Sequence, residues 1–93
     1  MKHISSTQNP IYKNLKALVT TAKARREQKQ AIIEGIHLAE SYLQTGKLPL
    51  SCIVSGSGYE NNEVKTIVET CEEAGVQILV ITEEQFRALS VVE

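Results

Sequence analysis

Apolar residues recur along the chain with spacings that change from segment to segment, and each spacing predicts one kind of element. In "PIYKNLKALVTTA", which starts at Pro10, they recur every three or four positions, as on one face of an amphipathic helix. Asn9 suits the N-cap of this helix, and Pro10 suits its first turn, where no N–H is needed. A continuous helix would carry Arg26 onto the apolar stripe. We therefore predict a break between Thr20 and Ala24, followed by a short basic helix or turn that faces solvent.

The remaining chain alternates short apolar runs with helical patterns. Three runs predict buried strands, namely "AIIEG" (31–35), "LPLSCIVSGS" (48–57) and "VQILVIT" (76–82). Helices are predicted between and after these runs, in "IHLAESYLQTG" (36–46), "ENNEVKTIVETCEEAG" (60–75) and "EEQFRALS" (83–90). Gly46 and Gly75 suit the ends of the first two, while Thr82 and Gln85 form a capping-box pattern before the third. This order predicts an α/β fold, a three-layer α/β/α sandwich with a small, largely parallel sheet of three or four strands.

Length and composition narrow the class of protein. A chain of 93 residues forms one domain with a single modest core. Its apolar runs all fall short of the ~18 residues that span a membrane, and its first residues lack the apolar stretch of a secretory signal, so we expect a cytoplasmic protein. Cys52 and Cys71 are interpreted as buried, reduced thiols. Two cysteines and two distant histidines do not make a zinc site, so no metal is expected.

The overall net charge of −1 conceals a strong asymmetry. Residues 1–30 hold seven basic side chains and one acidic one, whereas residues 31–93 hold three basic and ten acidic ones. A concentrated positive segment indicates an anionic partner, and nucleic acid is the leading candidate, although a solvated helix face would explain part of the pattern. Because aromatic side chains are few, we expect recognition of backbone and shape rather than of bases. The candidate RNA-binding residues are Lys13, Lys16, Lys23, Arg25, Arg26 and Lys29.

Three residues beside this basic segment are candidates for supporting an RNA site. Glu34 is expected at the end of a buried strand, where it would accept N–H groups of the following helix or pair with Arg25 or Arg26. Gly35 permits a tight strand-to-helix turn. His37 could contact RNA or be a structural surface histidine. No set of nucleophile, base and orienting group can be assembled, so no catalytic residue is predicted.

Several motifs, taken in order, resemble the N-terminal substrate-binding domain of the SpoU/TrmH class of RNA 2′-O-ribose methyltransferases. They are "ISSTQNPIYKNLKAL" (4–18), the pair Arg25–Arg26, "AIIEGIHLAE" (31–40) and "FRALS" (86–90). The resemblance implies a fold shared with small ribosomal and kink-turn-binding proteins, and a role in holding structured RNA, expected to be ribosomal RNA. It also implies a methyltransferase domain after residue 93 that binds S-adenosylmethionine and forms a homodimer. The motifs of that domain are absent from these residues, so no catalytic role is carried over.

Two other functions fit the same sequence. One is a standalone RNA-binding protein of the ribosomal or kink-turn type, and the other is a small α/β protein-interaction domain whose basic segment only aids solubility. The apolar pair Val91–Val92 directly after the last predicted helix suggests that the chain is a fragment of a longer protein.

Overall fold

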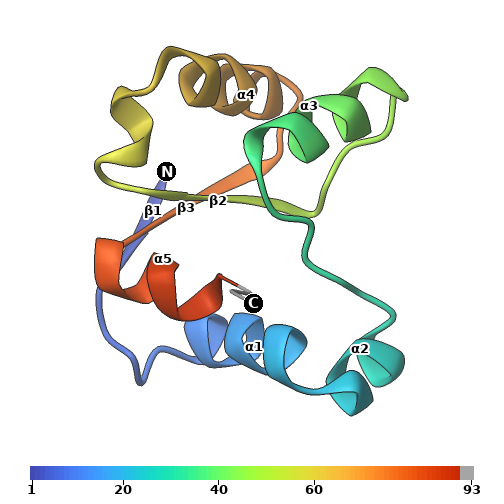
Figure 1. The fold of residues 1–93 in the computed structure, drawn as a ribbon, viewed down its shortest axis with the longest axis vertical. Coiled ribbons are helices and arrows are strands. Elements are labelled where there is room, and N and C mark those ends of the chain that lie inside the picture. The colour runs from blue at the N-terminus through green and yellow to red at the C-terminus, as the bar shows by residue number, and fades with distance from the viewer. Residues whose placement is uncertain (91–93) are drawn as a thin grey trace.

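The computed structural model describes residues 1–90, and they form a three-layer α/β/α sandwich as predicted (Figure 1). The sheet lies between two helical layers, one formed by α3 and α4 and the other by α1, α2 and α5. The elements, in chain order, are β1 (Lys2–Ile4), α1 (Pro10–Thr20), α2 (Ala22–Gln28), α3 (Ile36–Gln44), β2 (Ser51–Ser55), the 3₁₀ turn η1 (Gly58–Glu60), α4 (Asn62–Glu73), β3 (Gln77–Ile81) and α5 (Glu83–Leu89).

The sheet has three parallel strands in the order β1-β3-β2. Ile81 of β3 lies opposite Ile4 on one side and Ser55 on the other. Parallel neighbours need crossover connections, which the helices supply. β3 is therefore the central strand, and its apolar run 78–81 fits a strand covered on both faces.

Successive residues of β3 face opposite layers, and this alternation divides the core in two. Leu79 packs toward α1 and α5, in a buried cluster with Ile4, Tyr12, Leu15 and Ile81. Ile78 packs on the other face, in a buried cluster with Val54, Val68 and Cys71. One strand thus anchors both helical layers.

The helix ends follow the predicted local signals. The Asn9 side chain accepts hydrogen bonds from the backbone N–H groups of Ile11 (2.8 Å) and Tyr12 (3.4 Å) at the start of α1. Thr82 and Gln85 form the predicted capping box at the start of α5. The glycines after α3 and α4 adopt positive φ angles, which favour glycine.

The predicted break after the first helix is confirmed at Thr21. Its backbone is extended, so α1 ends there and α2 begins, and its side chain accepts a hydrogen bond from the N–H of Ala24 (3.3 Å). α2 buries none of its residues, as predicted for a basic helix facing solvent.

The prediction of a strand at residues 31–35 is wrong. The segment has no strand pairing and connects α2 in one layer to α3 in the other, passing the end of β2 (Figure 1). Ile32 packs against the core, while Ile33 is 44% exposed. Because the segment crosses from one helical layer to the other, it passes the end of the sheet and does not run beside a strand with which it could pair. The third strand is β1 instead, which the sequence pattern did not predict.

Within residues 1–90, no helix is both long and apolar enough to cross a bilayer. The expectation based on Val91–Val92 lies outside the described residues.

Candidate RNA-binding surface

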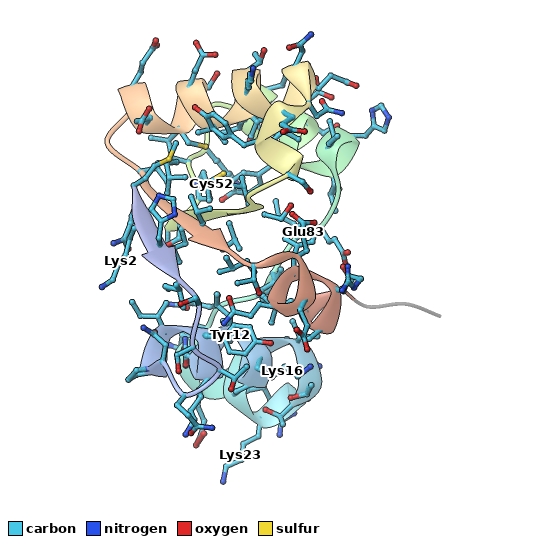
Figure 2. The ribbon with its side chains drawn as sticks, turned by 90° about the vertical axis from the view of Figure 1, so that its left-hand side faces the viewer. Lys2, Tyr12, Lys16, Lys23, Cys52 and Glu83 are labelled. Atoms are coloured by element: carbon cyan, nitrogen blue, oxygen red, sulfur yellow. The ribbon has the colours of Figure 1, made fainter. Side chains whose placement is uncertain are left out.

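The six basic candidates lie on two consecutive helices of one layer. Lys13 and Lys16 are on α1, Lys23, Arg25 and Arg26 are on α2, and Lys29 is the C-cap of α2. Figure 2 shows Lys23 at the end of the molecule opposite α4. The basic segment therefore occupies one end of the fold.

A side-chain hydrogen bond holds α2 against α1. The Nε2 amide of Gln28 donates to Oδ1 of Asn14 over 2.7 Å and joins the end of α2 to the middle of α1. The extended backbone of Thr21 lets the chain change direction between the two helices, so that α2 packs against α1. The two helices that carry the cations therefore pack against each other.

Arg25 is half-buried, and its guanidinium is bound to the end of α1. Its Nη1 donates to the carbonyl oxygens of Leu18 (2.8 Å) and Val19 (3.3 Å). The last carbonyls of a helix lack partners within the helix and carry its negative partial charge, so a cation stabilises them. Arg25 therefore helps to end α1, a role that the sequence analysis missed although a basic residue shortly after a helix is its signal.

Lys16 is also engaged within the fold. Its Nζ donates to the carbonyl oxygen of Ala88 over 2.6 Å, which links α1 to the last turn of α5. The four other candidates have exposed side chains and form what we call the exposed cation set, which consists of Lys13, Lys23, Arg26 and Lys29.

Two of the predicted site residues, nine positions apart, line one pocket. Arg25 and Glu34 meet there with apolar side chains from α1, α5 and the 31–35 segment. The pocket has a volume of about 240 Å³ and opens to solvent. We call it the corner pocket, and its lining residues are Leu18, Val19, Arg25, Ala31, Ile32, Glu34 and Leu89. Glu34 is an exposed residue here and does not end a strand.

Gly35 and His37 have different positions. Gly35 has a φ of +103°, a conformation that other residues rarely adopt, and its carbonyl accepts the first hydrogen bond of α3 from Ala39 (3.0 Å). The His37 side chain is 96% exposed, with Nδ1 lying 3.8 Å from Oε1 of Glu40. His37 does not line the corner pocket.

The sequence analysis missed a polar cluster at the carboxyl ends of β2 and β3. Oε1 of Glu83 accepts hydrogen bonds from the backbone N–H (2.8 Å) and the hydroxyl (2.5 Å) of Ser57. These bonds hold the pKa of Glu83 below its usual value, and the bond from the hydroxyl has the largest effect. Figure 2 places Glu83 at the start of α5, so the cluster joins the loop before α4 to the opposite layer. The sequence shows a polar loop after each of these two strands, but it does not show that the strands are neighbours. The cluster could be predicted only once the strand order was known.

The cysteines are free thiols, in agreement with the sequence interpretation. Cys71 is a buried residue of α4, and Cys52 is half-buried on β2. Burial raises the pKa of Cys52 to about 12, with Cys71 nearby adding to the effect, and burial also raises the pKa of Cys71. Both thiols therefore remain protonated at neutral pH.

Besides the corner pocket there is a surface pocket of about 270 Å³ between α3 and α4. Both are smaller than the ~300–1,000 Å³ typical of cofactor sites. In residues 1–90, no group of three or more His, Cys, Asp or Glu side chains could hold a metal ion.

Comparisons with known proteins define the family of this domain. The sequence profile of the MRM3-like substrate-binding domain matches residues 9–93, so the chain belongs to this family. The match confirms the resemblance to the substrate-binding domain of SpoU-class rRNA methyltransferases.

Two relatives agree with this assignment. Over 44 residues the chain is 50% identical to an uncharacterized tRNA/rRNA methyltransferase from Synechocystis sp., covering 47% of this chain and 16% of that protein. The crystal structure of an rRNA methyltransferase from Sinorhizobium meliloti superposes with a TM-score of 0.72 at 24% identity, covering 95% of this chain and 31% of that one, and shows the fold. The chain thus spans less than a third of either relative.

Proposed function

We propose that this domain binds structured RNA, most specifically ribosomal RNA, and positions it for 2′-O-methyl transfer by a separate domain of the parent protein. That domain would bind S-adenosylmethionine and form the homodimer, and the parent protein would act in the cytoplasm. The observation that carries the proposal is the family match over residues 9–93, on a chain whose cations gather on α1 and α2. A standalone kink-turn protein and a protein-interaction domain are less favoured, because both relatives are methyltransferases.

The exposed cation set would supply the affinity by neutralising phosphates. Each neutralised phosphate releases counterions, so affinity falls as salt rises. Four contacts give a slope of log K against log salt of about −2.8 for single-stranded RNA and about −3.6 for a duplex. Arg26 can grip one phosphate through two N–H groups, whereas the lysines act as point charges.

The test measures binding of a fluorescent ribosomal RNA hairpin to the 93-residue protein by anisotropy, at 50, 100 and 200 mM salt. Replacing Lys23 and Arg26 with alanine should reduce the magnitude of the slope by about 1.4–1.8. The matched control replaces Lys47 and Lys65, which lie after α3 and on α4, and should leave the slope unchanged. Absence of binding at 50 mM salt would refute the proposal and favour a protein-interaction domain.

A further inference from the structure

Exposed apolar side chains gather in one stretch of the chain. Five large apolar residues are exposed within residues 1–90, and four of them lie between positions 33 and 50. We call them the exposed apolar set, which consists of Ile33, Leu38, Leu48 and Leu50. We propose that the methyltransferase domain of the parent protein docks on this set. The inference rests on the proposed function, because that function supplies the partner domain.

The four residues come from parts of the chain that meet near the start of β2. Ile33 belongs to the 31–35 segment, and Leu50 directly precedes β2. Figure 1 shows that the 31–35 segment passes the start of β2 on its way to α3. α3 begins at the end of that segment with Leu38 in its first turn, and Leu48 lies on the return from α3 to β2. The set is therefore grouped at one end of the sheet.

The packing of the domain itself leaves α3 poorly covered. This helix buries none of its residues, although it carries Ile36, Leu38 and Leu43. The two other described helices of eight or more residues both have buried side chains, three on α1 and two on α4. An amphipathic helix normally buries its apolar stripe against its own core. A contact with another domain would remove the exposed apolar set from water, which is favourable.

The charge around the exposed apolar set suits a protein partner better than RNA. Residues 31–50 carry two glutamates and one lysine, whereas residues 22–29 carry four basic side chains and one glutamate. RNA binding depends on neutralising phosphates, and the cations for this lie on α1 and α2. The cores of protein–protein interfaces are instead apolar and depleted in charged residues. The exposed apolar set therefore fits a protein surface, and a domain docked there leaves the exposed cations to RNA.

The proposed partner follows α5 in the parent protein, and α5 ends beside this surface. Leu89, the last residue of α5, lines the corner pocket together with Ala31 and Ile32, and Ile33 is the next residue along the chain. A domain tethered at such a point has a high effective concentration at the nearest surface, so a modest apolar contact is enough to hold it. The chain spans less than a third of either relative, so both relatives contain enough further chain for a second domain.

Docking at this surface would place the methyltransferase domain next to the basic layer. Arg25 of α2 lines the same corner pocket as Ile32 and Leu89, so the pocket borders both surfaces. RNA held by Lys23 and Arg26 would then lie along the boundary between the two domains. The interface would thus fix the position of the RNA-binding helices relative to the domain that transfers the methyl group.

The test compares backbone hydrogen exchange in the full-length parent protein and in the 93-residue protein, by mass spectrometry. Docking excludes water from the contact, so residues 31–35 and 46–50 should exchange at least about tenfold more slowly in the parent protein. Residues 56–60, which follow the opposite end of β2, are the internal control and should exchange at equal rates in the two proteins.

Two pairs of substitutions at the same positions separate apolar contact from folding. Ile33→Ser with Leu50→Ser makes both side chains polar, and exchange in the parent protein should return to the rate of the 93-residue protein. Ile33→Val with Leu50→Met keeps both side chains apolar and should preserve the slow exchange. Thermal unfolding of the 93-residue variants verifies the fold. Leu50→Ser alone, at the most exposed residue of the set, repeats the test where the double variant is poorly folded, and it should also speed exchange.

The outcomes distinguish this inference from the proposed function. Equal exchange in the parent and the 93-residue protein, or slow exchange that survives in both serine variants, overturns the docking surface and leaves RNA binding standing. A dimer of the 93-residue protein in analytical ultracentrifugation that the serine pair dissociates also overturns it, because a second copy would then cover the set. Absence of RNA binding at 50 mM salt overturns the proposed function, while the exchange comparison still decides whether this surface is covered. A parent protein without a methyltransferase domain overturns both proposals.

Discussion

The two helical layers of this domain share one sheet but carry opposite charge. On one side, α3, η1 and α4 carry six glutamates and one lysine, Lys65. On the other side, α1, α2, the cap residue Lys29 and α5 carry seven basic residues and three glutamates. Both layers rest on buried clusters that meet the central strand β3. The two layers are therefore similar in their buried packing and differ mainly in the charge of their exposed residues.

The layers also differ in local regularity. Asn61 is the N-cap of α4, and its side chain accepts hydrogen bonds from the backbone N–H groups of Glu63 (2.8 Å) and Val64 (3.2 Å). A glycine follows the end of α4. The chain from α1 to residue 35 is interrupted at Thr21, uses Arg25 as a helix cap and crosses to the other layer without a strand. Departures from simple helix rules often accompany functional surfaces, and here they coincide with the basic layer.

The largest expected effect comes from the residues that join both layers to the sheet. Leu79 and Ile78 are 2% and 3% exposed and face opposite clusters. Each replacement with alanine should lower the free energy of unfolding by about 2–5 kcal/mol, measured by urea denaturation. If one variant were near neutral, the layer that it faces would not be packed as described. Leu50→Ala, at a residue 74% exposed, is the control and should change the stability by less than about 0.5 kcal/mol.

A smaller effect should distinguish the two adjacent arginines. Arg25→Ala removes two hydrogen bonds from the end of α1 and should lower the free energy of unfolding by about 1–2 kcal/mol. Arg26→Ala, at an exposed residue, should change stability by less than about 0.5 kcal/mol but weaken RNA binding. Equal stability of the two variants in urea denaturation would mean that Arg25 does not cap the helix.

The smallest effect concerns Glu83, which links the two layers at the carboxyl ends of β2 and β3. Its folded-state pKa lies below the usual 4.5, so its stabilising contribution is present above that pH and is lost as the pH falls through the folded pKa. Ser57→Ala should raise the pKa of Glu83 toward 4.5 and make the loss of stability in acid less steep. Carboxyl-carbon NMR titration measures the shift, with Ser41→Ala on α3 as the control. An unchanged titration would show that the hydroxyl bond does not form.

Sequence reasoning predicted what depends on local chemistry. Asn9, Thr82 and Gln85 cap helices as expected, because a cap needs only backbone groups within a few residues. The run at 31–35 misled, since a short apolar segment forms a strand only where an edge is available to pair with it. β1 was missed because three residues with a single buried side chain are too short for an alternation signal.

The candidate surface shows the same division. The first helix and the short basic helix that carry the cations were predicted, because charge and helical spacing are both visible in the sequence. Neither the hydrogen bond that Lys16 donates to Ala88 nor those that Ser57 donates to Glu83 could be predicted, because they join residues 72 and 26 positions apart. Whether the exposed cation set contacts RNA stays a prediction.

At Lys29, backbone stability and the proposed RNA affinity make opposite demands on one residue. It is the one residue other than glycine with a positive φ, 55°, within residues 1–90. This left-handed conformation costs a lysine about 1 kcal/mol relative to glycine. Lys29→Gly should therefore stabilise the domain, but it would also remove a cation from the basic layer. Thermostabilised versions of this protein should therefore be screened for RNA retention before they are used in its place.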